Sequence, residues 1–402
     1  MYDAATTSEA PTLLIEQLTL TNILSFGPEP ETVTFGPLTV LIGANGSGKS
    51  NLLEVIDLLR NAPDQLLKPI RNGGGIDEWR WKGAKEQSGD LSIEAVVHAF
   101  SNLSAMQLRY AVSINGFLSR SMIVGERIEA AQSQIGQDNP FIYYRRNLDK
   151  TCLNVGGVMQ AVDSESIDNN RSILAQRRDP LNYLMITALA ENLGRIRLYR
   201  EWSFGRYTPP RLPQRADMPI NWLEPDASNL GLVLNRLAGD PASKARILSA
   251  LNELYDGIDG FGVDIVSNSV QVFLHEGQFK IPATRLSDGT LRYLCLLAIL
   301  CHPDPPPLVC IEEPELGLHP DILPTVARLL QEASERCQLI VTTHSDVLVD
   351  AMTATPEAIV VCEKHNGATR LHRLSSEEMA PWLEKYRLGE LWISGQIGGS
   401  RW

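Results

Sequence analysis

The hydrophobic positions of the N-terminal part change from the two-residue period of strands to the period of a helix. Residues 13–20 alternate as in a strand, and residues 31–42 supply two more strand-like segments. From Leu52 to Leu59 the apolar residues recur at helical spacing. The pattern predicts strands that lead into a helix, with a glycine-rich turn between the last strand and the helix.

Further along the chain, an expected antiparallel meander precedes alternating helices and short strands. Strands of the meander are predicted at 91–100, 108–114 and 120–124. Helices are expected at 180–194, 230–237, 242–255, 291–301 and 322–335, and short strands at 196–203, 261–266, 270–274, 279–281, 308–311 and 338–341. No heptad repeat persists, so a helical lobe from about Asp179 to Gly260 is expected in place of a coiled coil.

The glycine-rich turn carries the clearest chemical motif. Gly43, Gly48, Lys49 and Ser50 fit G-x-x-x-x-G-K-[ST] in the strand-to-helix context that the motif requires. Glycines let backbone N–H groups close around a triphosphate, the lysine reaches the β and γ oxygens, and the hydroxyl ligates Mg²⁺. The sequence predicts nucleotide contacts along one run: Gly43, Ala44, Asn45, Gly46, Ser47, Gly48, Lys49, Ser50 and Asn51.

A second group of polar residues follows two apolar strands in the C-terminal part. Glu312 and Glu313 come directly after residues 308–311, and His344 follows residues 338–341. Two acids at the end of a buried strand are costly to desolvate unless a cation sits there, which predicts a Mg²⁺ site. By analogy with other P-loop enzymes, Glu312 is assigned to the metal and Glu313 to the attacking water. His344 is expected to reach a γ-phosphate.

Length, charge and cysteine content narrow the class of protein. A chain of 402 residues accommodates one large or two ordinary domains, and its net charge of −12 lowers the expectation of nucleic-acid binding without excluding a local basic face. No apolar run is long enough to span a membrane, and Met1 to Pro11 lacks the features of a secretory signal. The six cysteines form no C-x-x-C pair and are expected to be reduced core residues. A cytoplasmic location without membrane attachment is expected.

In order and spacing, these motifs resemble those of an ABC-type ATPase head. GANGSGKS, Gln176, LSDGT, CIEEPE, the GLHP turn and THS look like Walker A, Q-loop, signature, Walker B, D-loop and H-loop. The chain resembles RecF/SMC-like and OLD-like AAA-family ATPases in particular, over nearly its whole length.

The resemblance implies an α/β P-loop NTPase fold with an antiparallel β lobe, a parallel core sheet, an inserted helical lobe and no coiled coil. Four segments are expected. They are residues 1–178 (N-terminal part of the head), 179–260 (helical lobe), 261–365 (C-terminal part of the head) and 366–402 (C-terminal tail).

The resemblance also implies a dimer in which two heads enclose two ATP molecules. Each nucleotide would lie between Walker A of one subunit and the signature of the other, and hydrolysis would release the dimer. The implied ligands are Lys49 and the loop amides for phosphate; Ser50, Gln176 and Glu312 for Mg²⁺; Glu313 for water; and His344 with the opposing Ser287 and Gly289 for the transferred phosphoryl group.

Two residues depart from the usual pattern of such heads. Glu312 stands where most have Asp, as in OLD-like relatives, and its longer side chain should still reach the Mg²⁺ shell. Asp288 replaces the first glycine of the usual signature and adds a negative charge close to the expected phosphate. That charge bears on the strength of nucleotide-driven dimerisation.

Three classes of function are compatible with these motifs. The favoured one is a RecF-like or OLD-like ATPase that acts on DNA or controls a separately encoded effector in DNA repair or phage defence. An ATPase subunit of a membrane transporter is disfavoured by LSDGT, the Glu-Glu pair and the long insertion between Gln176 and Leu286. The third is a nucleotide-bound scaffold with negligible turnover.

Two segments without a periodic pattern are expected to dock a partner protein. The tail, Leu388 to Trp402, and the excursion, Trp202 to Ser228, both combine aromatic residues with turn-forming ones. An equal alternative is that the tail folds back over its own head. The candidate anchors are Trp392, Ile393, Ile397 and Trp402 in the tail, and Trp202, Arg206, Arg211, Arg215 and Trp222 in the excursion. The glycine- and tryptophan-rich loop Arg71 to Gly83 is interpreted as a surface connection, with a nucleotide contact as the alternative.

Overall fold

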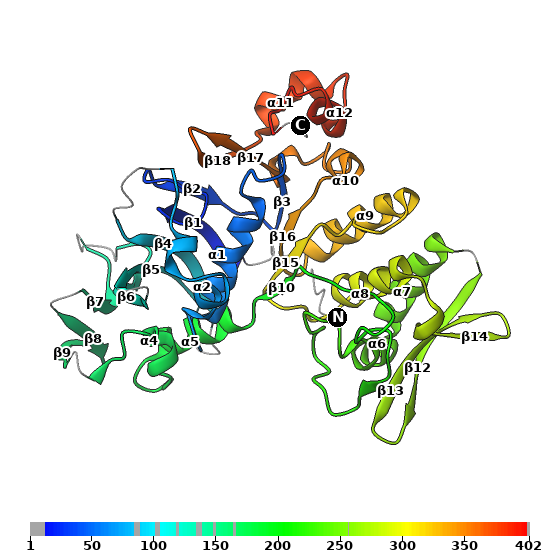
Figure 1. Ribbon diagram of the computed structural model, residues 1–402, viewed down its shortest axis with the longest axis horizontal. Coiled ribbons are helices and arrows are strands. Elements are labelled where there is room, and N and C mark those ends of the chain that lie inside the picture. The colour runs from blue at the N-terminus through cyan, green and yellow to red at the C-terminus, as the bar shows by residue number, and fades with distance from the viewer. Residues whose placement is uncertain are drawn as a thin grey trace, which may run out of the picture. The chain divides into compact units, whose positions relative to one another are not determined.

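The computed structural model describes residues 13–83, 89–100, 105–117, 120–133, 139–147, 150–163, 166–255 and 257–399 (Figure 1). The chain divides into two compact units. The first, here called the Walker unit, contains Leu14–Arg200, Pro307–Pro314 and Ile340–Trp402. The second, here called the signature unit, contains Glu201–Pro306 and Glu315–Leu339. These boundaries differ from the four expected segments, because the excursion and the signature fall in one unit.

An antiparallel sheet of eight strands forms one layer of the Walker unit. The strand order is β2-β1-β4-β5-β6-β7-β8-β9. The bounds are β1 Ile15–Thr21, β2 Glu31–Thr34, β4 Leu91–Phe100, β5 Ala105–Phe117, β6 Arg120–Ala130, β7 Ile142–Arg146, β8 Thr151–Val155 and β9 Val158–Val162. The predicted meander is confirmed in β4, β5 and β6. The last three strands were not predicted because they lack clear alternation, and β9 is exposed at four of its five residues.

A six-stranded sheet forms the second layer of the Walker unit, in the order β10-β15-β16-β3-β17-β18. β10 pairs with β15 and β3 with β17 in parallel, whereas β18 is antiparallel to β17. The bounds are β3 Leu38–Ile42, β10 Arg197–Tyr199, β15 Leu308–Glu312, β16 Gln338–Thr342, β17 Ile359–His365 and β18 Ala368–Arg373. β3 and β16 are buried at every residue, which explains why most of their side chains are apolar.

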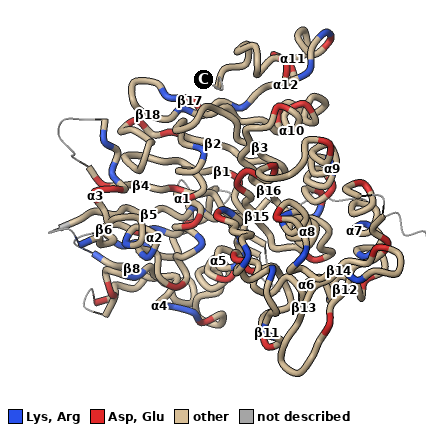
Figure 2. The backbone as a smooth tube through the Cα atoms, turned by 45° about the vertical axis from the view of Figure 1, so that its right-hand side comes forward, with Lys and Arg blue, Asp and Glu red and all other residues tan. Residues whose placement is uncertain are grey.

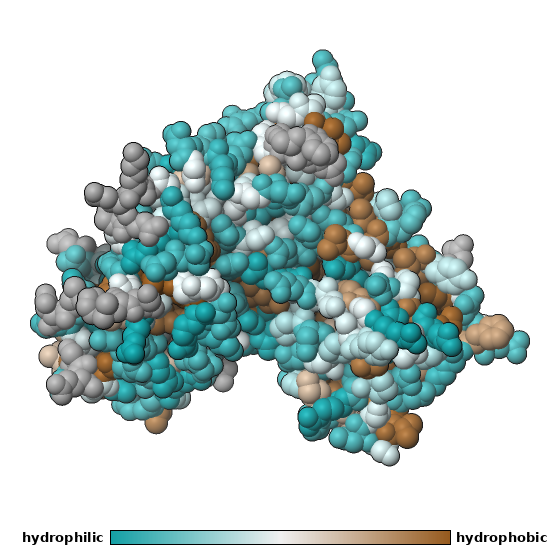
Figure 3. Space-filling view, viewed as in Figure 1, coloured by the Kyte–Doolittle hydropathy of each residue, from teal (hydrophilic) through white to brown (hydrophobic). Residues whose placement is uncertain are grey.

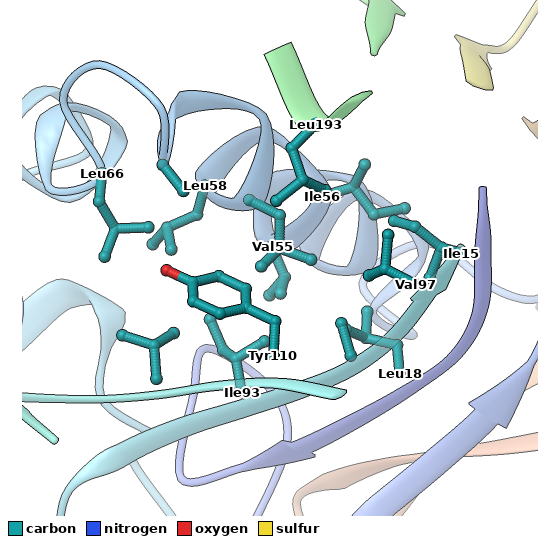
Figure 4. Packing of buried hydrophobic residues seen from close by; sticks show 14 of the residues in the cluster. Ile15, Leu18, Val55, Ile56, Leu58, Leu66, Ile93, Val97, Tyr110 and Leu193 are labelled. Atoms are coloured by element: carbon teal, nitrogen blue, oxygen red, sulfur yellow. The ribbon is translucent and has the colours of Figure 1, made fainter. Parts of the chain in front are cut away.

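Helix α1 (Lys49–Asn61) packs its apolar face into the main core of the Walker unit. Leu52, Leu58 and Leu59 are fully buried. Figure 4 shows the Tyr110 ring of β5 lying among Leu58, Leu66 and residues of the sheet. Each such fully buried side chain contributes about 1.5–3 kcal/mol relative to exposure. The core therefore fixes the start of α1, where the glycine-rich turn ends.

The remaining helices of the Walker unit are short. Their bounds are α2 Lys68–Asn72, α3 Ile76–Trp79, α4 Ile173–Gln176, α5 Leu184–Gly194, α10 Asp346–Asp350, η4 Pro356–Ala358, α11 Ser376–Leu383 and α12 Leu388–Ile393. The helix predicted from residue 180 begins only at Leu184, because the Asp179 carboxylate accepts the backbone N–H groups of Leu181 and Asn182 and holds a turn there. The strand predicted at 196–203 is also shorter than expected. It is β10, which ends at Tyr199.

The signature unit combines helices with a small antiparallel sheet. Its elements are β11 Gln214–Arg215, α6 Leu230–Ala238, α7 Pro241–Leu254, β12 Ile258–Val266, β13 Ser269–Glu276, β14 Phe279–Pro282, η2 Ala283–Arg285, α8 Asp288–Leu300, η3 Pro320–Ile322 and α9 Leu323–Ser334. The lobe predicted as helical thus also carries strand β11, which pairs with β13. The longest described helix is α7 with 14 residues, so the prediction of a head without a coiled coil is confirmed for the described chain.

The surface is mainly hydrophilic and most cysteines are buried, as expected for a globular protein. Figure 3 shows a largely hydrophilic face on which apolar residues occur in small groups. All six cysteines are free, and all except Cys152 are buried. Burial raises the pKa of the Cys362 thiol to about 12, which keeps it protonated and unreactive. No described helix has both the length and the apolar character to cross a membrane.

Candidate functional site

The phosphate loop, residues 43–48, joins β3 to α1 through glycines whose backbone conformation disfavours other residues. Gly43, Gly46 and Gly48 have φ angles of 147°, 75° and 113°. A Cβ atom on Gly43 would lie 2.2 Å from the carbonyl oxygen of Cys362, and one on Gly48 would lie 2.2 Å from Oγ1 of Thr369. The loop is therefore pressed against β17 and β18, and its curvature depends on the absence of side chains.

Lys49 spans the inside of this loop. Its Nζ donates hydrogen bonds to the carbonyl oxygens of Gly43 at 2.7 Å and Ala44 at 3.1 Å, and the side chain is buried. Ser47 Oγ is buried without a hydrogen-bond partner among the described residues. A buried cation beside an unsatisfied hydroxyl, at the N-terminus of α1, fits an anionic ligand.

A threonine on β18 anchors the loop from outside the motif. Thr369 Oγ1 forms hydrogen bonds of 2.7 Å with both Ser25 Oγ and the carbonyl oxygen of Ser47. Its own backbone N–H donates to the carbonyl oxygen of Ser25 at 2.7 Å. This contact was not visible in the sequence, where Thr369 lies far from the motif it supports.

The first acid of Walker B meets the phosphate loop directly. Ser50 Oγ donates to Glu312 Oε1 at 2.5 Å. The other carboxylate oxygen accepts a 2.9 Å hydrogen bond from Nε of Arg200, which also lies 3.6 Å from Glu54 of α1. Burial alone would lower the pKa of Arg200, but the hydrogen bond and charge of Glu312 and the charge of Glu54 raise it. Glu312 is therefore held in one orientation from two sides.

The oxygen atoms of Ser50 and Glu312 are suitable ligands for Mg²⁺. Ser50 and Glu312 present a hydroxyl and a carboxylate at one point beside the phosphate loop. Oxygen ligands of this kind, together with phosphate oxygens and water, are the ones that Mg²⁺ prefers. The contact with Ser50 is compatible with the expected role of Glu312 at the metal, which stays a prediction.

Glu313 and His344 meet at the ends of neighbouring strands. Glu313 has a φ angle of 47°, rare for a residue with a side chain, and its N–H donates to the carbonyl oxygen of Thr342 at 3.0 Å. His344 Nε2 lies 3.5 Å from Glu313 Oε1. Strained backbone of this kind persists where the surroundings impose it and is concentrated at functional sites.

Gln176 is the one predicted metal ligand whose contacts in this structure point elsewhere. Its amide nitrogen donates to the carbonyl oxygens of Asp168, Arg171 and Ser172, and its amide oxygen accepts from the N–H of Asp168. The side chain thus closes its own loop, because backbone groups of a tight turn compete for the amide. Its role at the metal stays a prediction that this geometry does not support.

The signature turn lies in the other unit, at the start of α8. Ser287 is the N-cap, since its Oγ accepts from the N–H of Thr290 at 3.0 Å. A Cβ atom on Gly289 would lie 2.7 Å from the carbonyl oxygen of Gly317, in the D-loop. The turn and the D-loop therefore pack backbone against backbone, and Ser287 stays exposed at the helix N-terminus.

Arg211 supplies a contact to the signature turn that was not predicted. Its guanidinium is buried and donates to the carboxylate of Asp288 and to the carbonyl oxygen of Leu286, the latter at 2.6 Å. It was predicted as an exposed docking anchor, which is wrong. A signal was present in the sequence, because an aspartate in the place of a signature glycine calls for a nearby cation.

The tail is folded onto its own unit, so the prediction of Trp392 as an exposed anchor is also wrong. α12 forms despite the neighbouring glycines, because Glu390 caps the N–H of Arg387 at 2.8 Å. Trp392 is 1% exposed, and its Nε1 donates to the carbonyl oxygen of Gly399 at 2.7 Å. Gly399 lies against Gly43, since a Cβ atom on it would be 3.2 Å from the Cα of Gly43.

The other predicted anchors have mixed surroundings. Trp202 is partly buried under Arg292, whose guanidinium lies 5.4 Å from its ring centroid, and Trp222 Nε1 donates to the carbonyl oxygen of Asp304. Ile393 is 57% exposed. Arg206 and Arg215 are exposed and Ile397 is partly buried. Trp402 lies outside the described residues.

Comparison with known proteins places these motifs in a family. The family model described as "AAA domain, putative AbiEii toxin, Type IV TA system" matches residues 38–147 and 160–350. No curated protein matches the chain.

Solved structures of Smc head domains share the fold. An Smc head bound to the C-winged helix domain of ScpA matches with a TM-score of 0.55 and 16% identity, over 91% of this chain and 99% of that chain. An Smc head with an extended coiled coil bound to the C-terminal domain of ScpA, from Pyrococcus furiosus, matches with a TM-score of 0.56 and 14% identity, over 92% and 99%. One from Pyrococcus yayanosii, with a coiled coil and joint, matches with a TM-score of 0.51 and 13% identity, over 92% and 99%.

The family match spans more than half of the chain, and the structural matches show that the chain shares the fold of Smc head domains. The resemblance inferred from the motifs is thereby confirmed. The chain belongs to the AAA-domain family described as putative AbiEii toxin, Type IV TA system, and has the fold of an Smc head.

Proposed function

We propose that the chain binds ATP with Mg²⁺, hydrolyses it, and dimerises around it to control a separately encoded effector. The carrying observation is the 2.5 Å contact of Ser50 with Glu312 beside the phosphate loop, with Glu313 directly after the same strand and His344 after the neighbouring strand β16. These groups provide a phosphate cradle, two oxygen ligands, a carboxylate for water and an imidazole within one unit.

The residues of the loop hold the triphosphate. Backbone N–H groups at the start of α1 point to its phosphates, and Lys49 exchanges the carbonyl oxygens of Gly43 and Ala44 for phosphate oxygens. Bound Mg²⁺, held by Ser50 and Glu312, would neutralise charge on the β and γ phosphates. Glu313 orients the attacking water, and His344 donates a hydrogen bond to the γ-phosphate.

A surface hollow next to the loop provides room for the base. It has a volume of about 460 Å³ and is lined by Asn51 of α1, Ser25, Trp81 and Lys364, among others. The partly buried indole of Trp81 donates to the carbonyl oxygen of Gly367 at 3.2 Å, which fixes it at the rim. An aromatic ring there suits stacking with adenine, so the loop Arg71 to Gly83 contacts nucleotide rather than only connecting elements.

The exposed signature turn supports the proposed dimer. Ser287 is exposed at the N-terminus of α8, as required of a group that meets the γ-phosphate of a second head. Gly289, packed on Gly317, sets the position of that turn.

An effector protein fits the surface better than DNA does. On the antiparallel sheet Arg109 and Arg127 each pair with both Glu94 and Glu129, at 3.3–3.7 Å. Figure 2 shows basic and acidic positions interleaved over these strands. Paired arginines offer little net charge to a phosphate backbone. The family description, which names a toxin and a toxin–antitoxin system, supports an effector in defence.

The test is to purify the chain with the products of its neighbouring genes, with and without ATP and Mg²⁺. We expect ATP turnover, an ATP-dependent dimer of the Glu313→Gln variant, and co-elution of one neighbouring protein. A stable nucleotide complex without turnover would instead identify a scaffold. Co-elution of a membrane protein would identify a transporter subunit.

A further inference from the structure

The exposed carboxylate of Asp288 lies where the proposed dimer brings a γ-phosphate. It follows Ser287 directly and has 68% of its side chain exposed. Two anions that are brought close together repel each other, so an Asp288 without a compensating charge would weaken the ATP-bound dimer. The molecule must compensate this charge if the proposed sandwich forms.

Arg211 of the excursion provides the compensation. Only 9% of its side chain is exposed, and one guanidinium nitrogen donates to the Asp288 carboxylate. The other terminal nitrogen donates to the carbonyl oxygens of Leu286 at 2.6 Å and Ala283 at 3.3 Å. The fork of an arginine can make these contacts at once, whereas a lysine could not.

A second contact, from Nε of Arg211, holds the guanidinium to the backbone of the excursion. Nε of Arg211 donates to the carbonyl oxygen of Phe204 at 3.2 Å. Phe204 in turn packs against Arg292 of α8, whose guanidinium lies 5.4 Å from the ring centroid. The excursion is thus attached to the signature helix at two points, and its path places Arg211 behind the turn.

The surroundings of Asp288 carry a net positive charge. A surface pocket of about 660 Å³ beside the turn is lined by Arg206, Arg211, Arg285 and Asp288, together with Gly205, Tyr207, Leu212 and Thr284. Three arginines against one aspartate give a surface that accepts an anion.

We infer that Arg211 is a positioning residue of the ATP-dependent interface. It neutralises Asp288 and fixes the backbone of the signature turn, so that Ser287 can meet the γ-phosphate of a second copy of this chain. This inference rests on the proposed function. It assigns to the excursion a role within the ATPase rather than a role in docking.

The experiment measures ATP-dependent dimerisation of full-length protein in the Glu313→Gln background by sedimentation, with Arg211→Gln added. The dimer should weaken about tenfold, while binding of a fluorescent ATP analogue to the monomer stays unchanged. The matched control is Arg215→Gln, four residues along the same segment, whose exposed guanidinium pairs only locally with Asp217. The control should dimerise as the parent does.

Rescue separates the charge from a general loss of structure. Adding Asp288→Gly to Arg211→Gln removes the unpaired carboxylate and should restore most of the lost dimerisation. A second variant leaves the buried arginine untouched. Asp288→Asn should strengthen the dimer, and the gain should shrink at high salt.

The outcomes are distinguishable. If the Glu313→Gln parent does not dimerise with ATP, the proposed function fails. If the parent dimerises and Arg211→Gln does so equally well, or Asp288→Asn weakens the dimer, the inference about Arg211 is wrong. If Asp288→Gly gives no rescue, charge neutralisation is excluded as the role of Arg211.

Discussion

The phosphate loop and the signature turn are both supported by segments that show no pattern in the sequence, but the two supports differ in kind. Behind the phosphate loop, Gly399 of the tail lies against Gly43, so the contact is backbone on backbone. Behind the signature turn, Arg211 of the excursion contacts Asp288, so the contact is between charges. Both segments had been predicted to dock a partner.

The difference shows how each motif tolerates change. The phosphate loop is held by close packing, so it requires glycine at positions 43 and 48. A side chain at either position would collide with β17 or β18. A turn held by an ion pair accepts an unusual residue, Asp288, provided that its partner is present. The signature of this chain could therefore depart from the common pattern while the phosphate loop could not.

The largest effect is expected at the strand ends. Glu313→Gln should reduce ATP turnover by about 10²–10⁴-fold, because the amide cannot accept a proton from water, and it should leave ATP binding intact. Lys49→Ala should instead weaken binding itself. Steady-state hydrolysis and equilibrium binding of both variants measure this, and wild-type turnover by Glu313→Gln would remove the role assigned to it.

The next effect tests the packed support of the phosphate loop. Trp392→Ala should destabilise the protein by about 3–5 kcal/mol, because the indole is buried and hydrogen-bonded to Gly399. Trp382→Ala is the matched control, since that side chain on neighbouring α11 is 45% exposed and should cost little. Denaturant unfolding gives the free energies. Equal stability of the two variants would mean that the tail does not support the unit.

Truncation after Tyr386 extends the same test. It removes Leu388, Leu391 and Trp392, which are at most 2% exposed. The product should be insoluble or strongly destabilised. A truncated protein with unchanged thermal stability and ATPase activity, but without a co-purifying partner, would restore the docking interpretation of the tail.

Sequence patterns predicted what is local and missed what is distant. The strand, loop and helix around Lys49 follow from hydrophobic period and the glycine spacing, and β15 and β16 follow from their unbroken apolar runs. Arg200 and Thr369 were not predicted, and Arg211 was predicted only as a docking anchor, because each contacts a residue far away in the chain. β9 was missed for a different reason, since a mostly exposed edge strand has no apolar pattern to read.

The ion pair of Arg200 with Glu312 at the Walker site is comparable to the ion pair of Arg211 with Asp288 at the signature turn. Arg200→Gln should leave Glu312 held only by Ser50 and raise the Mg²⁺ concentration needed for nucleotide binding about tenfold. Arg197→Gln, three residues earlier in β10, is the control, because its guanidinium donates to the nearby carbonyl oxygens of Gly194 and Ile196. Mg²⁺ titrations of nucleotide binding measure the effect. An unchanged Mg²⁺ dependence in Arg200→Gln would show that the packed loop alone positions the acid.

The smallest effect concerns Glu363, a charged residue that contacts the tail. The backbone N–H of Gly399 donates to the Glu363 carboxylate at 2.6 Å, and this hydrogen bond, aided by His365, holds the pKa of Glu363 below its usual value of 4.5. Because the folded-state pKa is the lower one, the stabilisation is complete above about pH 4.5 and is lost as the pH falls through the folded-state value. Glu363→Gln should therefore lower the unfolding midpoint slightly at neutral pH, and the difference from the parent should vanish in acid. Urea unfolding of both proteins between about pH 3 and pH 7 measures this difference. If the stability difference between Glu363→Gln and the parent stayed constant across that range, the tail would be held by packing alone. The support of the phosphate loop would then involve no charge, unlike that of the signature turn.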